Sequence, residues 1–141
     1  MKDIKVKPEK ENAQQKVVLY QILQKKLEEL QQEVLIIERK FLEIESASQT
    51  LSDIGKGEGQ GDVYFSVGSG IYAKGKVTDR DNIMVEIGRD IMVSKDVKGA
   101  REVLDSRKAD IEKEGEKLKN SIETTVAKLR EIASEIQSMQ P

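Results

Sequence analysis

Apolar and polar residues alternate in the middle of the chain, and the alternation occurs twice. Residues 63–74 and 83–94 each contain an alternating segment, a glycine-led turn and a second alternating segment. This is the period of a half-buried strand that turns and returns, so we predict two β-hairpins built on one plan. Their apolar positions are Val63, Phe65, Val67, Ile71 and Ala73 in the first copy, and Ile83, Val85, Ile87, Ile91 and Val93 in the second.

Segments with a different period flank this repeat. Before it, the core positions from Tyr20 to Leu51 are spaced alternately three and four residues apart, and a poorer seam with the same spacing runs from Val97 to Met139. Such heptad spacing predicts long helices that pack as a coiled coil. Because the chain turns round through the hairpins, the two helices should be antiparallel.

The expected fold is therefore mainly α with a small β part, a long antiparallel coiled coil joined through two β-hairpins. Four glycines between residues 55 and 61 should end the first helix, because glycine loses much backbone entropy in a helix. In chain order we expect a frayed N-terminal tip (1–12), a coiled-coil helix (13–54), a glycine-rich joint (55–62), a two-hairpin assembly element (63–95) and a second coiled-coil helix (96–141).

A register for the two helices follows from matching their irregular positions. Setting Leu51 opposite Leu104 pairs a glycine with a bulky ring and a lysine with a small hydroxyl. On this basis Gly115→Leu should overpack the coil and destabilise it by roughly 1 to 3 kcal/mol. The pairs that this register predicts include Ser48 with Lys108, Phe41 with Gly115, and Lys16 with Met139.

Composition narrows the possible functions. The chain has 141 residues, of which 37% are hydrophobic and 35% charged, with a net charge of -2 and neither Cys nor His. This excludes thiol and imidazole catalysis, the usual zinc sites and disulfides, and leaves carboxylate and Lys chemistry as the only catalytic options. We expect no metal, no cofactor and no enzymatic activity. The charge argues against nucleic-acid binding. With no long apolar run for a signal peptide or membrane span, a cytoplasmic protein is expected.

One segment imitates a nucleotide site. Residues 70–76 have the glycine and lysine spacing of a phosphate-binding loop. Val77, however, occupies the position where a magnesium-binding Ser or Thr is needed, and the segment alternates like a strand. Nucleotide binding is therefore not expected.

Two parts of the chain should need partners. Isolated hairpins are marginally stable and expose strand edges, so residues 63–95 should pair with neighbouring subunits. At the outer ends of the helices, apolar residues cover more of the circumference than a heptad stripe needs, which indicates contact with another molecule, or else extra packing between the two helices. The candidate contact residues are Val17, Val18, Leu19, Tyr20 and Leu23, with Ile22 between them, and Ile132, Ile136 and Met139 opposite.

The duplicated strand-glycine-strand unit between two heptad arms resembles the α-class subunit of prefoldin. The specific part of the resemblance is residues 66–75 together with their echo at residues 85–93. Ser66 and Asp90 depart from the family pattern, which often has Pro and Gly at these positions. Two hairpins are typical of the α class, whereas β-class subunits have one.

This resemblance implies an ATP-independent chaperone of archaea and eukaryotes. Two α-class and four β-class subunits would join their hairpins into an intersubunit β-barrel from which six coiled coils extend. Non-native proteins would be held at the coiled-coil tips and delivered to a group II chaperonin. The hairpin positions would then serve assembly, and the apolar ends of the arms would bind clients.

Two other readings remain open from the sequence. The chain can be a structural coiled-coil adaptor or a filament subunit, whose hairpins polymerise and whose arms bind one folded partner. An enzyme that uses carboxylates of the second helix is a third alternative, although no paired base is evident.

Overall fold

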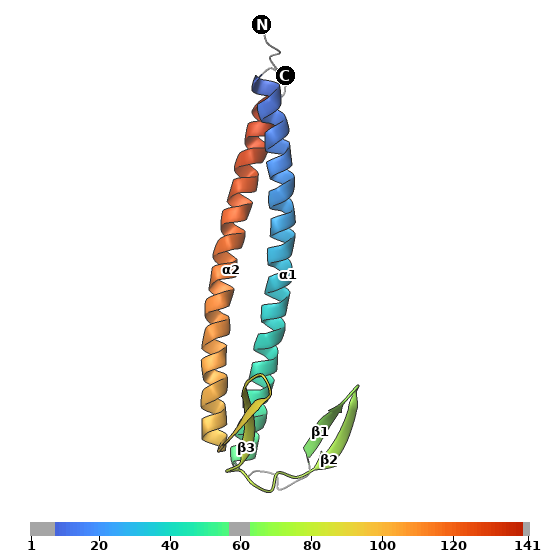
Figure 1. Ribbon diagram of the computed structural model, residues 1–141, viewed down its shortest axis with the longest axis vertical. Helices are drawn as coiled ribbons and strands as arrows, with labels where there is room; N and C mark the ends of the chain where they lie inside the picture. The colour runs from blue at the N-terminus through green and yellow to red at the C-terminus, as the bar shows by residue number, and fades with distance from the viewer. Residues whose placement is uncertain (1–7, 57–62, 140–141) are drawn as a thin grey trace. The chain divides into compact units, whose positions relative to one another are not determined.

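The fold consists of two long helices, and two β-hairpins lie between them in the sequence. The computed structural model describes residues 8–56 and 63–139, and Figure 1 follows them from the first helix through four strands to the second. The expectation of a mainly α fold with two small hairpins is confirmed, whereas the intersubunit β-barrel involves other chains and stays a prediction. The elements are α1 (Pro8–Lys56), β1 (Val63–Gly68), β2 (Ile71–Gly75), β3 (Ile83–Gly88), β4 (Ile91–Lys95) and α2 (Val97–Met139).

The chain divides into two compact units. The arm unit combines Met1–Arg39 with Glu112–Pro141, so it contains the first part of α1 and the last part of α2. The hairpin unit is Lys40–Ile111, which contains both hairpins and the helix segments next to them. The packing of side chains is therefore described for each unit by itself.

The arm unit has a narrow core along the facing sides of its two helices. Leu129 is 8% exposed and Ile132 2% exposed, as a heptad seam predicts for positions three residues apart. Thr125 is also buried, and its hydroxyl donates a hydrogen bond of 2.7 Å to the Ser121 carbonyl. This bond satisfies the hydroxyl within its own helix, so a polar residue is accommodated in an apolar position.

The helices are aligned differently from the expected register. A Cβ atom on Gly115 would lie 3.9 Å from Cγ2 of Ile37, and Nζ of Lys16 lies 2.9 Å from Oε2 of Glu135. The expected partners were Phe41 and Met139, each four residues away along the sequence. The register was therefore wrong by about one helical turn, and the overpacking expected for Gly115→Leu loses its basis.

In the hairpin unit, too, the partners of a charged residue differ from those of the expected helix register. Nζ of Lys108 lies 2.7 Å from Oε1 of Glu45 and 5.4 Å from the ring centroid of Phe41. The register had placed Ser48 near this lysine. The ammonium group is instead held by a carboxylate and an aromatic face, which stabilise a cation better than one hydroxyl does.

The ends of the two helices approach closely in the hairpin unit. A Cβ atom on Gly55 would lie 3.0 Å from Cγ1 of Val97, so a side chain at residue 55 would require Val97 to move. Ala100, on the next turn of α2, is 2% exposed. Gly55 was expected to begin the glycine-rich joint, but it lies within α1, where its missing side chain makes room for α2. Residues 57–62 of that joint lie outside the described residues.

Local signals define the starts of both helices. Oδ1 of Asp96 accepts a 2.7 Å hydrogen bond from the backbone N–H of Gly99, so Asp96 is the N-cap of α2. α1 begins at Pro8, within the segment expected as the N-terminal tip (1–12), and proline is favoured at the first position of a helix. Residues 1–7 of the expected N-terminal tip lie outside the described residues.

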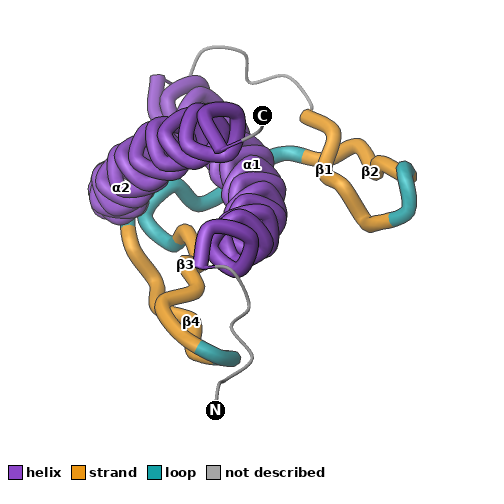
Figure 2. Tube along the Cα trace, turned by 90° about the horizontal axis from the view of Figure 1, so that it is seen from above, coloured by secondary structure: helices purple, strands orange, loops and turns teal. Residues whose placement is uncertain are grey.

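Each hairpin forms its own two-stranded antiparallel sheet, shown as separate pairs of orange strands in Figure 2. Both contain a bulge before the turn, between Ser66 and Gly68 in β1 and between Glu86 and Gly88 in β3. The bulges occupy equivalent positions of the repeat. The two hairpins therefore share one plan in structure as well as in sequence.

The turns nevertheless differ. Ser69 and Gly70 both have positive φ, at 51° and 77°, as a type I′ turn requires. In the second turn Asp90 has a φ of 57°, whereas Arg89 before it does not have a positive value. A single positive φ, at the second residue of the loop, departs from the type I′ pattern, and Asp adopts this left-handed conformation at modest cost.

Candidate functional site

One face of the β1–β2 hairpin is apolar and uncovered. Phe65 pairs with Ala73 across the strands, and its ring lies against Gly75, whose Cβ position is 3.1 Å from Cε2 of the ring. Val67 and Ile71 are 63% and 62% exposed. An apolar face of this kind within a two-stranded sheet lacks the covering layer that an independent sheet needs.

The β3–β4 hairpin is better covered than the first. Ile83, Val85 and Val93 are half-buried, whereas Ile87 and Ile91 near the turn are exposed. A guanidinium nitrogen of Arg107 in α2 donates a hydrogen bond to the carbonyl of Glu86 in β3. The second hairpin is thus attached to a helix of its own unit, while its turn end remains available.

The opposite faces of the hairpins also carry large exposed side chains. The alternation that places Phe65 on one side of β1 places Tyr64 on the other, and Met84 and Met92 are the corresponding residues of the second hairpin. These residues were not among the expected assembly positions. The signal was present, because apolar residues occupy both phases of the alternation at residues 63–65 and 83–85. The four residues on these faces are Tyr64, Tyr72, Met84 and Met92, all exposed.

The residues expected at the end of the arms differ in exposure. Val17, Val18 and Leu19 are exposed, as is Ile22 at 59%. Ile132 of α2 is 2% exposed and faces the interior of the helix pair, so it does not contribute to the exposed surface of the arm, and its role in client binding stays a prediction. The remaining candidates are half-buried, namely Tyr20, Leu23, Ile136 and Met139.

A second exposed apolar site on α1 was not expected. Leu35 and Ile36 are 54% and 50% exposed, next to the seam residues Val34 and Ile37. A heptad seam uses two of these four consecutive apolar residues, so the other two had to point outward. In the hairpin unit, Leu42 is likewise exposed, at 67%.

One carboxylate in the arm unit has a perturbed pKa. The hydrogen bond from Lys16 holds the pKa of the Glu135 carboxyl below its ordinary value, and the positive charges of Lys16 and Lys128 act in the same direction. This is the behaviour of an ion pair that joins two helices.

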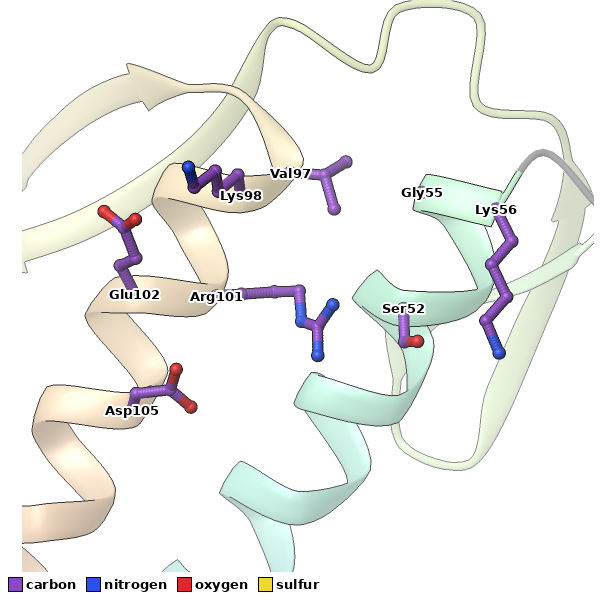
Figure 3. A pocket seen from close by; sticks show the side chains of 8 residues that line it. All are labelled: Ser52, Gly55, Lys56, Val97, Lys98, Arg101, Glu102 and Asp105. Atoms are coloured by element: carbon purple, nitrogen blue, oxygen red, sulfur yellow. The ribbon is translucent and has the colours of Figure 1, made fainter.

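A pocket of about 610 Å³ lies between the last turn of α1 and the first turns of α2 in the hairpin unit. Figure 3 shows the Arg101 side chain extending across it toward α1 and Ser52, while Lys56 and Lys98 point away. The cations are accompanied by two carboxylates, so the lining has little net charge. Its residues are Ser52, Gly55, Lys56, Val97, Lys98, Arg101, Glu102 and Asp105.

Within the described ranges, His, Cys, Asp and Glu side chains form no group of three or more that would hold a metal ion. Among the same residues, neither helix is long and apolar enough to cross a membrane.

Comparison with known proteins agrees with this architecture. Residues 23–141 match the family model described as prefoldin subunit. Prefoldin subunit alpha of Thermofilum pendens is 31% identical over 117 residues, covering 83% of this chain and 91% of the relative. The corresponding protein of Methanobrevibacter smithii is 29% identical over 110 residues, covering 78% and 70%. The cryo-EM structure of filamentous PFD from Methanocaldococcus jannaschii has a TM-score of 0.67 at 21% identity, covering 86% of this chain and 98% of that one.

The two helices and the two hairpins define a coiled-coil subunit, and the family match makes it a chaperone-type subunit. The chain belongs to the prefoldin subunit family, and the resemblance to its α class is confirmed by the archaeal alpha subunits among its relatives.

Proposed function

We propose that this chain is the α-class subunit of a cytoplasmic prefoldin that holds non-native proteins without ATP and passes them to a group II chaperonin. Its partners in this proposal are β-class subunits, in a hexamer of two α and four β chains, with neither nucleic acid nor membrane involved. The observation that carries the proposal is the apolar surface of α1 formed by Val17, Val18, Leu19 and Ile22, hereafter the α1 tip surface.

The hairpins support the assembly part of the proposal. Two sheets of two strands each leave apolar side chains such as Val67 and Ile87 in contact with water. Pairing their free edges with strands of neighbouring subunits covers these side chains and satisfies the edge backbone groups. A closed barrel is the arrangement that removes every edge.

The α1 tip surface supports the client-binding part. Each contact between an exposed aliphatic side chain and an unfolded segment is weak, and several arms together supply avidity while each contact remains quickly reversible. This mechanism requires no cofactor and no covalent step.

The test uses the complex assembled with a β-class subunit. Replacing Val18 and Ile22 together by Ser should leave assembly unchanged and strongly reduce the suppression of aggregation of a denatured client, measured by light scattering without ATP. Leu42→Ser is the matched control, because it removes a similarly exposed side chain from the hairpin unit. Equal suppression by all three complexes would refute client binding at the α1 tip surface.

Two further measurements separate this role from that of a filament or adaptor subunit. Mass measurement of the purified complex should give a closed hexamer with the β-class subunit, whereas open polymers of this chain alone would favour a filament. Delivery is tested by adding a group II chaperonin and ATP to the client complex. Release and refolding of the client would support transfer, and retention of the client on the complex would contradict it.

A further inference from the structure

The arm unit contains an apolar groove at Gly115, well separated in sequence from the α1 tip surface. The groove has a volume of about 480 Å³. This lies within the range of roughly 300 to 1,000 Å³ that is typical of ligand sites. Its apolar lining is Val34 and Ile37 from α1 and Gly115, Leu118 and Ile122 from α2, with Glu38, Lys119 and Glu123 at the edges.

The glycine is not required by close packing of the helices. A Cβ atom on Gly115 would meet only Cγ2 of Ile37, at 3.9 Å, which is an ordinary van der Waals contact. This differs from Gly55, where a Cβ atom would be 3.0 Å from Val97. Glycine within a helix is unfavourable relative to alanine. Gly115 therefore lowers the stability of α2 and leaves an open groove in exchange.

The surroundings of the groove indicate what it can accept. Glu38 and Glu123 contribute two negative charges and Lys119 one positive charge, so the edges carry an excess of negative charge. Leu35 is 54% exposed and lies three residues from Glu38, which makes the two neighbours on the surface of α1. One exposed apolar side chain thus lies next to an acidic residue of the groove lining.

From this geometry we infer that the groove binds one large apolar or aromatic side chain of an extended polypeptide, with a basic residue beside it. The inference rests on the proposed chaperone function and adds a second client contact along the arm. The aromatic group would lie against Ile37, Leu118 and Ile122, and the basic group would approach Glu38 or Glu123. Such a site would favour client segments in which aromatic and basic residues are adjacent.

A peptide with a single Trp tests this inference directly, because the chain itself contains no Trp. The probe is a short, otherwise polar peptide with Trp next to Lys, added to the assembled complex while the Trp emission is recorded. Saturable binding with a blue shift is expected. Peptides with Ala in place of Trp, labelled at one end for detection by anisotropy, or with Glu in place of Lys, should bind more weakly.

Variants of the groove complete the test. Gly115→Leu places a side chain in the groove and should weaken binding of the Trp peptide about tenfold, the lower end of the effect of shape changes in apolar pockets. Gly115→Ala should weaken it less while raising the unfolding temperature, and it remains informative if the Leu variant folds poorly. Asn120→Ala is the matched control, because it improves helix propensity at an exposed position and should leave binding unchanged.

The results separate this inference from the proposed function. Equal affinity of wild type and Gly115→Leu for the Trp peptide would overturn the groove as a site, and the Val18 and Ile22 variant would still report on client binding at the tip. If the wild-type complex fails to suppress aggregation but binds the peptide in a Gly115-dependent way, the chaperone role fails and the groove stands as a peptide site.

Discussion

Replacing Ile132 by Ala distinguishes a core residue from a client-binding residue. Ile132 is 2% exposed, so the substitution removes buried methyl and methylene groups and leaves a cavity between the helices. Ile→Ala substitutions in such sites destabilise by about 2 to 5 kcal/mol. Ile22→Ala is the matched control, because the same atoms are removed from a side chain that is 59% exposed. Its effect on stability should stay within about 0.5 kcal/mol.

The assay for this prediction is urea unfolding followed by circular dichroism. Hydrogen exchange of the α2 amides should accompany it, because exchange reports local opening that a global unfolding curve does not resolve. Ile132→Ala should accelerate exchange near the end of α2, whereas Ile22→Ala should lower client binding at unchanged stability. The reasoning fails if Ile132→Ala loses less than about 0.5 kcal/mol and client binding falls, since that is how a surface residue behaves.

Substitutions at three further positions test local features. Asp96→Ala removes the cap on the Gly99 N–H and should reduce the free energy of unfolding by about 1 kcal/mol, measured by urea unfolding. Asp90→Val forces a branched side chain to a φ of 57° and should cost about 1 to 2 kcal/mol, whereas Asp90→Gly should be tolerated; exchange of the β3–β4 amides reports both. Lys16→Met should raise the pKa of Glu135 toward its ordinary value in an NMR titration. With Lys16 present, the ion pair stabilises the fold above that ordinary value, and this contribution is lost as the pH falls through the lowered pKa.

The elements of the fold were predictable because their signals are local. Heptad spacing and strand alternation depend on residues close together in the sequence. The helices coincide with the heptad segments and the hairpins with the alternating segments. The helix register was not predictable in the same way, since displacing a heptad seam by one turn still pairs apolar residues with apolar residues. Irregular positions had to decide it, and size matching selected Phe41 for Gly115. The ring of Phe41 instead lies beside the Lys108 ammonium, whose charge requires partners more strongly than a glycine requires a bulky neighbour.

The candidate site was predictable only in part for a related reason. Apolar residues at the end of a helix are equally compatible with mutual packing and with an outside partner, so from the sequence both possibilities stayed open for both helices. Burial separates them: Ile132 packs inside, whereas Ile22 lies outside the seam and is exposed. Leu35 and Ile36 were missed because Val34 and Ile37 already satisfied the heptad pattern of that segment.

These exposures give the two helices different roles. Within the described ranges, the large apolar side chains that the helices expose all belong to α1, and those of α2 are buried or half-buried. α2 therefore covers the seam of α1, and α1 presents the surplus apolar residues. Removing the end of α2 would take away part of this cover and add apolar surface on α1. A truncated chain that binds clients more strongly would thus be consistent with a site on α1, and point substitutions of Val18 and Ile22 are the sharper test because they leave the seam covered.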